Sequence, residues 1–244
     1  MDRRHRLLVA MVCLCAGIAS TRAIPFAAQA QLGLFTESTD VGTPSTIGPG
    51  SARYDAARQV YTISGGGENM WGTSDHFHFL WKKVSGDVAL EATVAFVGTL
   101  PATGTPAGHR KAVLVLRQTL DADAVYADAA AHGDGLTSLQ WRATRGEATH
   151  EVQSSIVGPT RLRIEKRGDY VSMSVAGPGE ALRPADGAAR VEFTGEFYVG
   201  LGVTAHDTGR IETAEFSGVS LSAPPQAAAT TMVNTLENHQ HPVR

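Results

Sequence analysis

Residues Ser64 to Val97 read SGGGENMWGTSDHFHFLWKKVSGDVALEATVAFV, and this stretch decides the fold. A glycine run and a second turn at Ser85–Asp87 frame an aromatic segment, after which a clear strand begins. In Val88–Phe96 the alternate positions are Val, Leu, Ala, Val and Phe, whereas the positions between them include Glu91 and Thr93. This period of two is typical of a β-strand that buries one of its faces. The stretch therefore predicts strands joined by tight turns.

The rest of the chain continues this pattern, because turn-forming residues separate short apolar segments. Ala124–Ala131 has helical propensity, but turn-forming clusters flank it and we expect a strand. Gly177–Ala189 is rich in Gly, Pro and Ala and is expected to be a loop, and Gly65–Gly67 is expected to end a strand. About ten to twelve strands without a convincing helix predict an all-β sandwich of two antiparallel sheets. Further strands are expected at Leu32–Thr36, Gln59–Ile63, Lys111–Gln118, Leu136–Thr144, Phe197–Thr204 and Thr213–Leu221, with a hairpin at Arg161–Ala176.

The composition narrows the classes of partner. The chain has 244 residues, a formal charge of −3 and 43% hydrophobic residues, which is enough for a packed core. Lysines and arginines are scattered among acids and form no basic stripe, so we expect no nucleic-acid binding.

The N-terminus predicts export. Met1–Arg6 is positively charged, Leu7–Ala19 is apolar but short for a membrane span, and Ala28–Ala30 has the small-x-small pattern of a cleavage site. We expect a signal peptide at residues 1–30, with a cut after Ala23 or an uncleaved anchor as alternatives. The mature protein would be periplasmic or extracellular, without stable membrane insertion. The sandwich is expected at residues 31–221 and a flexible tail at 222–244.

Both cysteines, Cys13 and Cys15, lie inside the predicted signal peptide. The mature chain would then contain no thiol, which excludes thiolate catalysis and cysteine-based zinc binding. An exported domain without disulfides must depend on its hydrophobic core.

The segment WGTSDHFHFLW at Trp71–Trp81, followed by Ser85–Val88, resembles a known signature. It is similar to the "aromatic-Gly…Asp-x-Phe-x-Phe…Gly-Asp" pattern of bacterial concanavalin A-like domains of the "regulation of enolase" type. Lys111–Gln118, Leu162–Gly168 and Tyr198–His206 resemble further strands of these domains. The resemblance implies a concanavalin A-like jelly roll over Leu32–Leu221.

The chain departs from this family at one hairpin and extends beyond the domain at its end. Ser174–Gly179 lacks the Asp and Trp that the family often carries after its hairpin turn. Met232–Glu237 resembles the first strand of the Tol-type propellers that follow this domain in some larger exported proteins.

Catalytic and metal-binding patterns are weak. The chain lacks the Glu-x-Asp-x-x-Glu arrangement of jelly-roll glucanases and the Gly-x-Ser-x-Gly elbow of serine hydrolases, so we expect no enzyme. A histidine metal site is conceivable, but the same alternation arises when a strand turns its polar side to solvent. Calcium ligands at Asp40, Asp75 or Asp87 lack a recognisable spacing, so no metal or cofactor is predicted. The histidines considered for a metal are His76, His78, His109 and His206.

Alternation in the aromatic segment predicts a recognition face. We expect Phe77, Phe79 and Trp81 to enter the core, which would place the histidines between them on the open face of the sheet. Planar polar groups beside an aromatic side chain suit sugar hydroxyls or another polar polymer, although an ordinary polar network would look the same. The predicted ligand-binding residues are Trp71, His76, His78, Arg117, Tyr126, Gln140, Arg142 and His206.

These observations predict an exported, non-catalytic recognition module for carbohydrate or another polar polymer. A structural or accessory domain that docks an envelope protein is the alternative. A glycoside hydrolase ranks third.

Overall fold

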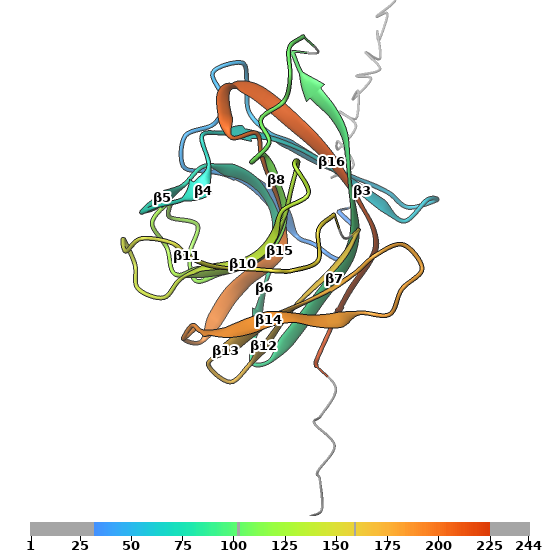
Figure 1. Cartoon of the computed structure of the whole chain (residues 1–244). Coiled ribbons are helices and arrows are strands. Elements are labelled where there is room, and N and C mark those ends of the chain that lie inside the picture. The colour runs from blue at the N-terminus through green and yellow to red at the C-terminus, as the bar shows by residue number, and fades with distance from the viewer. Residues whose placement is uncertain (1–31, 102, 159, 225–244) are drawn as a thin grey trace, which may run out of the picture.

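The computed structural model describes residues 32–101, 103–158 and 160–224, and these residues contain strands and no helix (Figure 1). The predicted signal peptide and most of the predicted tail lie outside the described residues. The described part of the chain therefore also has no apolar helix of membrane-spanning length. The strands are β1 (Glu37–Val41), β2 (Ser51–Asp55), β3 (Val60–Gly67), β4 (Met70–Trp71), β5 (Ser74–Asp75), β6 (Phe77–Ser85), β7 (Val88–Leu100), β8 (Lys111–Arg117), β9 (Tyr126–His132), β10 (Thr137–Arg142), β11 (His150–Gln153), β12 (Arg161–Arg167), β13 (Tyr170–Ala176), β14 (Arg183–Arg190), β15 (Glu196–Thr204) and β16 (Asp207–Ser222).

Fourteen of the strands form two seven-stranded antiparallel sheets, which confirms the predicted sandwich. The first sheet has the order β1-β6-β15-β8-β9-β10-β11, and the second has the order β14-β13-β12-β7-β16-β3-β2. Half of the neighbouring pairs join non-consecutive strands, such as β6 with β15 and β7 with β16, so the sheets are completed only when distant parts of the chain come together. β4 and β5 form a separate two-stranded hairpin.

The main core lies between the two sheets. On β7 the predicted inward set is buried from Val88 to Val94, whereas Glu91 faces outward and pairs with Arg161. All seven residues of β8 are buried, because this strand is covered on both faces as its apolar run predicted. A full-length strand also forms at β9, so turn chemistry outweighs the helical propensity of its alanines.

The outer face of the first sheet carries a second, smaller core. Phe77, Phe79 and Trp81 of β6 pack there with residues of β8 and β9, and Met70 of the hairpin covers them. Both faces of this part of β6 are therefore buried. The β4–β5 hairpin thus covers part of the outer face of the first sheet. The part of that face beside the hairpin remains accessible.

Two strand predictions were wrong. Gly177–Ala189 is not entirely a loop, because the edge strand β14 begins at Arg183 and pairs with β13. The first strand begins at Glu37 rather than Leu32. Gly65–Gly67 does end a strand, because these glycines are the last three residues of β3. A Cβ on Gly65 would overlap the carbonyl oxygen of Val203, so glycine also permits close approach of the two sheets there.

Candidate functional site

A buried cluster of three charged side chains anchors the β4–β5 hairpin to the first sheet. Asp75 on β5 accepts hydrogen bonds from Arg117 on β8 at 2.6 Å and from both terminal nitrogens of Arg142 on β10 at 2.9 Å. All three side chains are fully buried. Bidentate pairing of this kind satisfies a buried carboxylate and fixes its geometry.

Arg142 also binds the backbone of the turn that follows Trp71. Arg142 donates to the carbonyl oxygen of Gly72 at 3.0 Å, and the amide of Thr149 donates to that oxygen at 2.8 Å. The hydroxyl group of Tyr126 lies 3.1 Å from that of Thr149, and the Arg142 guanidinium lies over the Tyr126 ring. These contacts fix the backbone on both sides of the turn, so Trp71 is presented by a rigid hairpin.

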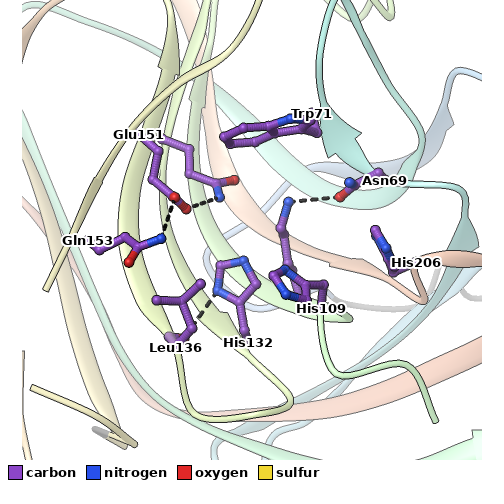
Figure 2. Close-up of a pocket in the computed structure, with 10 residues that line it drawn as sticks. Asn69, Trp71, His109, His132, Leu136, Glu151, Gln153 and His206 are labelled. Carbon is purple, nitrogen blue, oxygen red and sulfur yellow. Dashed lines mark hydrogen bonds between the residues drawn. The ribbon is translucent and has the colours of Figure 1, made fainter.

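Beside this hairpin lies a cavity of about 390 Å³. Trp71 forms one wall and keeps 42% of its surface exposed. Figure 2 shows Trp71 across from His109 and His132, with Glu151 and Gln153 at one end and Asn69 and His206 at the other. The ten lining residues are Asn69, Trp71, His109, Lys111, His132, Leu136, Gln140, Glu151, Gln153 and His206.

A second depression of about 470 Å³ adjoins the first. It shares Asn69, Trp71 and His206 with the cavity and adds Glu68, the turn Gly72–Ser74 and His76. Trp71 thus lies between two hollows. A ligand longer than one ring could contact the indole from either hollow.

Glu151 carries the negative charge of the cavity. It accepts hydrogen bonds from the side-chain amides of Gln140 at 2.8 Å and Gln153 at 2.9 Å. Burial raises the pKa of Glu151, but these hydrogen bonds outweigh burial and the pKa is lowered overall. The side-chain oxygen of Gln140 has no hydrogen-bond partner among the described residues, although Gln140 is 1% exposed.

His132 is held neutral with a defined tautomer. Burial, followed by the charge of Lys111, lowers the pKa of His132 to about 4. Nδ1 lies 3.1 Å from the carbonyl oxygen of Leu136 and must donate to it. Nε2 of the neutral ring is then a hydrogen-bond acceptor. His109 lies between His132 and His206, with ring centroids 5.5 Å and 5.8 Å away.

Seven of the eight predicted site residues form three groups, and His78 is separate from them. Trp71, Gln140 and His206 line the cavity, and His76 lines the adjoining depression. Arg117, Tyr126 and Arg142 come together, but they are fully buried beneath the hairpin and present no surface to a ligand. Their observed contacts position Trp71. Whether the cavity-lining residues bind a ligand stays a prediction.

The predicted orientation of His78 was wrong. His78 is 4% exposed and points toward Gly65 of the second sheet. Its Nδ1 lies 2.8 Å from Asp40, which is opposite His78 on the neighbouring strand β1 of the first sheet. Phe77 and Phe79 occupy the outer face of the first sheet instead of the core between the sheets. Alternation separates the two faces of a strand correctly, but it does not say which face meets the other sheet when both are covered.

Sequence reasoning missed most of the polar cavity residues. Lys111 and His132 are directly opposite each other on β8 and β9, so hairpin pairing brings them together. The sequence did contain a sign of this polar cluster. Lys111, Asp128 and His132 interrupt otherwise apolar strands at positions that share one face of the sheet. The other residues missed as ligand contacts are Asn69, His109, Glu151 and Gln153.

Among the residues that the structure describes, no group of three or more His, Cys, Asp or Glu side chains is arranged to hold a metal ion. His109 lies next to His206, with ring centroids 5.8 Å apart, but His78 lies in the interior, so the four histidines considered for a metal (His76, His78, His109 and His206) do not meet at one point.

No protein-family model matches this chain, and no curated protein matches it in sequence. Solved structures match its fold. A protein of unknown function from Saccharomyces cerevisiae has a TM-score of 0.55 at 16% identity and covers 73% of this chain and 94% of its own. The family 7 alginate lyase A1-II′ has a TM-score of 0.40 at 11% identity, covering 70% and 81%. A lectin from Bauhinia forficata in complex with GalNAc has a TM-score of 0.39 at 9% identity, covering 78% and 99%.

The fold is a concanavalin A-like jelly roll. Its structural neighbours include lectins, polysaccharide lyases and glucanases. The fold does not decide between binding and catalysis.

Proposed function

We propose that the protein is an exported, non-catalytic module that binds carbohydrate in the cavity beside Trp71. One observation carries the proposal: a large exposed indole walls a cavity whose other walls hold amide, carboxylate and imidazole groups. Sugar rings pack their apolar C–H faces on aromatic side chains and present hydroxyl groups at the ring edge. The cavity offers both kinds of contact.

Rigidity supports the proposal. The buried Asp75, Arg117 and Arg142 cluster fixes the hairpin, and Glu151 is fixed by two amides. A site whose groups are already oriented loses little conformational freedom on binding. Such preorganisation favours recognition of a ligand with a fixed shape.

The arrangement of carboxylates supports binding over hydrolysis. Glycosidases place two carboxyl groups on opposite sides of the scissile bond. Glu151 is the one carboxylate among the residues that line the cavity, and Asp128 on the neighbouring strand is fully buried, so the cavity itself holds no pair of carboxylates. Glu68 lines the adjoining depression instead. Elsewhere, Glu91 and Glu165 on the second sheet are bridged by Arg163.

Two further parts of the proposal rest on the sequence. The charged and apolar N-terminal residues support export to the periplasm or the medium. The Trp71–Trp81 segment supports a relationship with the concanavalin A-like bacterial domains of the "regulation of enolase" type.

A glycan array probed with the mature protein tests the proposal. Trp71→Ala should weaken binding by about tenfold or more, since a central aromatic contact commonly carries this much affinity. Tyr170→Ala is the matched control, because Tyr170 is an exposed aromatic on the second sheet at 59% exposure. Equal binding by wild type and Trp71→Ala would overturn the assigned site. A blank array would overturn carbohydrate binding and favour the docking of an envelope protein.

A further inference from the structure

Lys111 is a buried basic side chain to which no carboxylate of the described residues is bonded. Its side chain lines the cavity, yet the residue is only 2% exposed. Nζ donates to the side-chain oxygen of Asn69 and to the carbonyl oxygen of Met70, both at 2.8 Å. Both acceptors are uncharged. No carboxylate of the described residues lies within ion-pair distance of this nitrogen, and an ammonium group has a third N–H to donate.

The nearest acid on the sheet does not fill this role. Asp128 belongs to the adjacent strand β9, and both of its carboxylate oxygens lack hydrogen-bond partners among the described residues. Burial raises the pKa of Asp128 well above its usual range and lowers the pKa of Lys111, so burial disfavours the charged form of both side chains. A buried charge without a partner is costly to maintain. An anionic ligand group would compensate Lys111.

The end of the cavity opposite Lys111 carries a negative charge. Glu151 is ionised and braced by Gln140 and Gln153, so it accepts hydrogen bonds from ligand hydroxyl groups. Figure 2 shows Glu151 and Asn69, the partner of Lys111, at opposite ends beneath Trp71. A second negative charge at the Glu151 end would be repelled. A sugar ring that presents an anionic group toward Lys111 and hydroxyl groups toward Glu151 matches both ends of the cavity.

Building on the proposed carbohydrate function, we propose that the sugar stacked on Trp71 is a uronate whose carboxylate accepts a hydrogen bond from Lys111. Nζ lies over the Trp71 ring, 5.6 Å from its centroid, in a cation–π contact. A sugar on this face of the indole must therefore be offset from Nζ and present its anionic group at the edge nearest to it. A carboxylate attached directly to the sugar ring meets this requirement. A sulfate ester projects its charge farther from the ring and fits less well.

Matched ligands test this inference on the unaltered protein. Tetramers of galacturonate, glucuronate, mannuronate and guluronate are compared by calorimetry with their carboxyl-reduced counterparts, which differ only in the charged group. We expect at least one uronate tetramer to bind about tenfold or more tightly than its reduced form, because a hydrogen bond to a buried charge is among the stronger polar contacts. Sulfated neutral tetramers form a third arm.

Variants then assign the preference to one residue. Lys111→Met should abolish the difference between acidic and reduced tetramers, whereas the exposed lysine variant Lys83→Met should retain it. If Lys111→Met fails to unfold cooperatively, loss of the wild-type preference at raised salt serves as the second readout.

The outcomes are distinct. Equal binding of acidic and reduced tetramers would overturn the uronate inference and leave the proposed carbohydrate function standing. Tighter binding of the sulfated tetramers would overturn the inference that the anionic group is a carboxylate. Absence of binding to every tetramer, together with a blank glycan array, would overturn both proposals.

Discussion

Replacing Asp75 by asparagine should remove the charge that anchors the hairpin while keeping the side-chain shape. Asp75 alone compensates two fully buried guanidinium groups, at 2.6 Å from Arg117 and 2.9 Å from Arg142. Removing one partner of a buried ion pair costs about 3–5 kcal/mol, because the remaining charge stays buried without compensation. An asparagine amide would also point a donor at other donors. We therefore expect Asp75→Asn to lower the free energy of unfolding by about 4 kcal/mol or more.

Urea unfolding followed by tryptophan fluorescence measures this change. Glu180→Gln is the control, since Glu180 pairs with Arg183 at 3.1 Å on the surface, where ion pairs contribute about 0–1 kcal/mol. The thermal midpoint of Asp75→Asn should fall by roughly 10 °C for a domain of this size. Affinity for carbohydrate should fall as well, because the hairpin carries Trp71. A loss of stability no larger than that of the control would refute the anchoring role of the cluster.

Three further predictions concern other buried positions. As the pH falls from 6.5 to about 4, the wild type should lose about 3 kcal/mol of unfolding free energy relative to His132→Asn. In this range the His132 side chain binds a proton in the unfolded chain, whereas in the folded protein its buried imidazole, with a pKa of about 4, does not. Stability is thus retained above pH 6.5, and unfolding at stepped pH shows whether the loss levels off below pH 4. Gly200→Ala should destabilise the fold by about 1–3 kcal/mol, because its Cβ would overlap the carbonyl oxygen of Leu80, whereas Gly98→Ala, which meets open space, should be nearly neutral in the same denaturation assay. His78→Ala should cost about 2–4 kcal/mol yet leave glycan binding unchanged; a loss of binding at full stability would contradict its interior position.

Most of the fold could be predicted because its strands alternate clearly. Val88–Phe96 and the Arg161–Ala176 hairpin have apolar residues on one face, so their register follows from the pattern. β14 was missed because an edge strand with Pro184 and Gly187 has the composition of a loop. The second role of Gly65 was not predicted, because the need for close approach between the sheets appears only once the sheets are assembled.

The candidate site was harder to predict, for a physical reason. Alternation in Phe77–Trp81 gives two faces, but the hairpin from β4 and β5 buries the outer one, so hydrophobicity does not distinguish them. Trp71, Gln140 and His206 were predicted and do line the cavity. Lys111 was read only as part of an apolar strand. Its buried charge becomes informative once the absence of a bonded acid among the described residues is seen.

The most direct test of the central claim is a ¹H–¹⁵N NMR titration of the mature protein with the uronate tetramers. The chain has three tryptophans, and Trp71→Phe assigns the indole resonance of the exposed one. We predict saturable shifts of the Trp71 indole and of the side-chain amides of Asn69 and Gln140. The indole of Trp141, which packs on the core between the sheets, should not shift. Saturable shifts confined to residues of the second sheet, or no shifts with any tetramer, would contradict carbohydrate binding at this cavity.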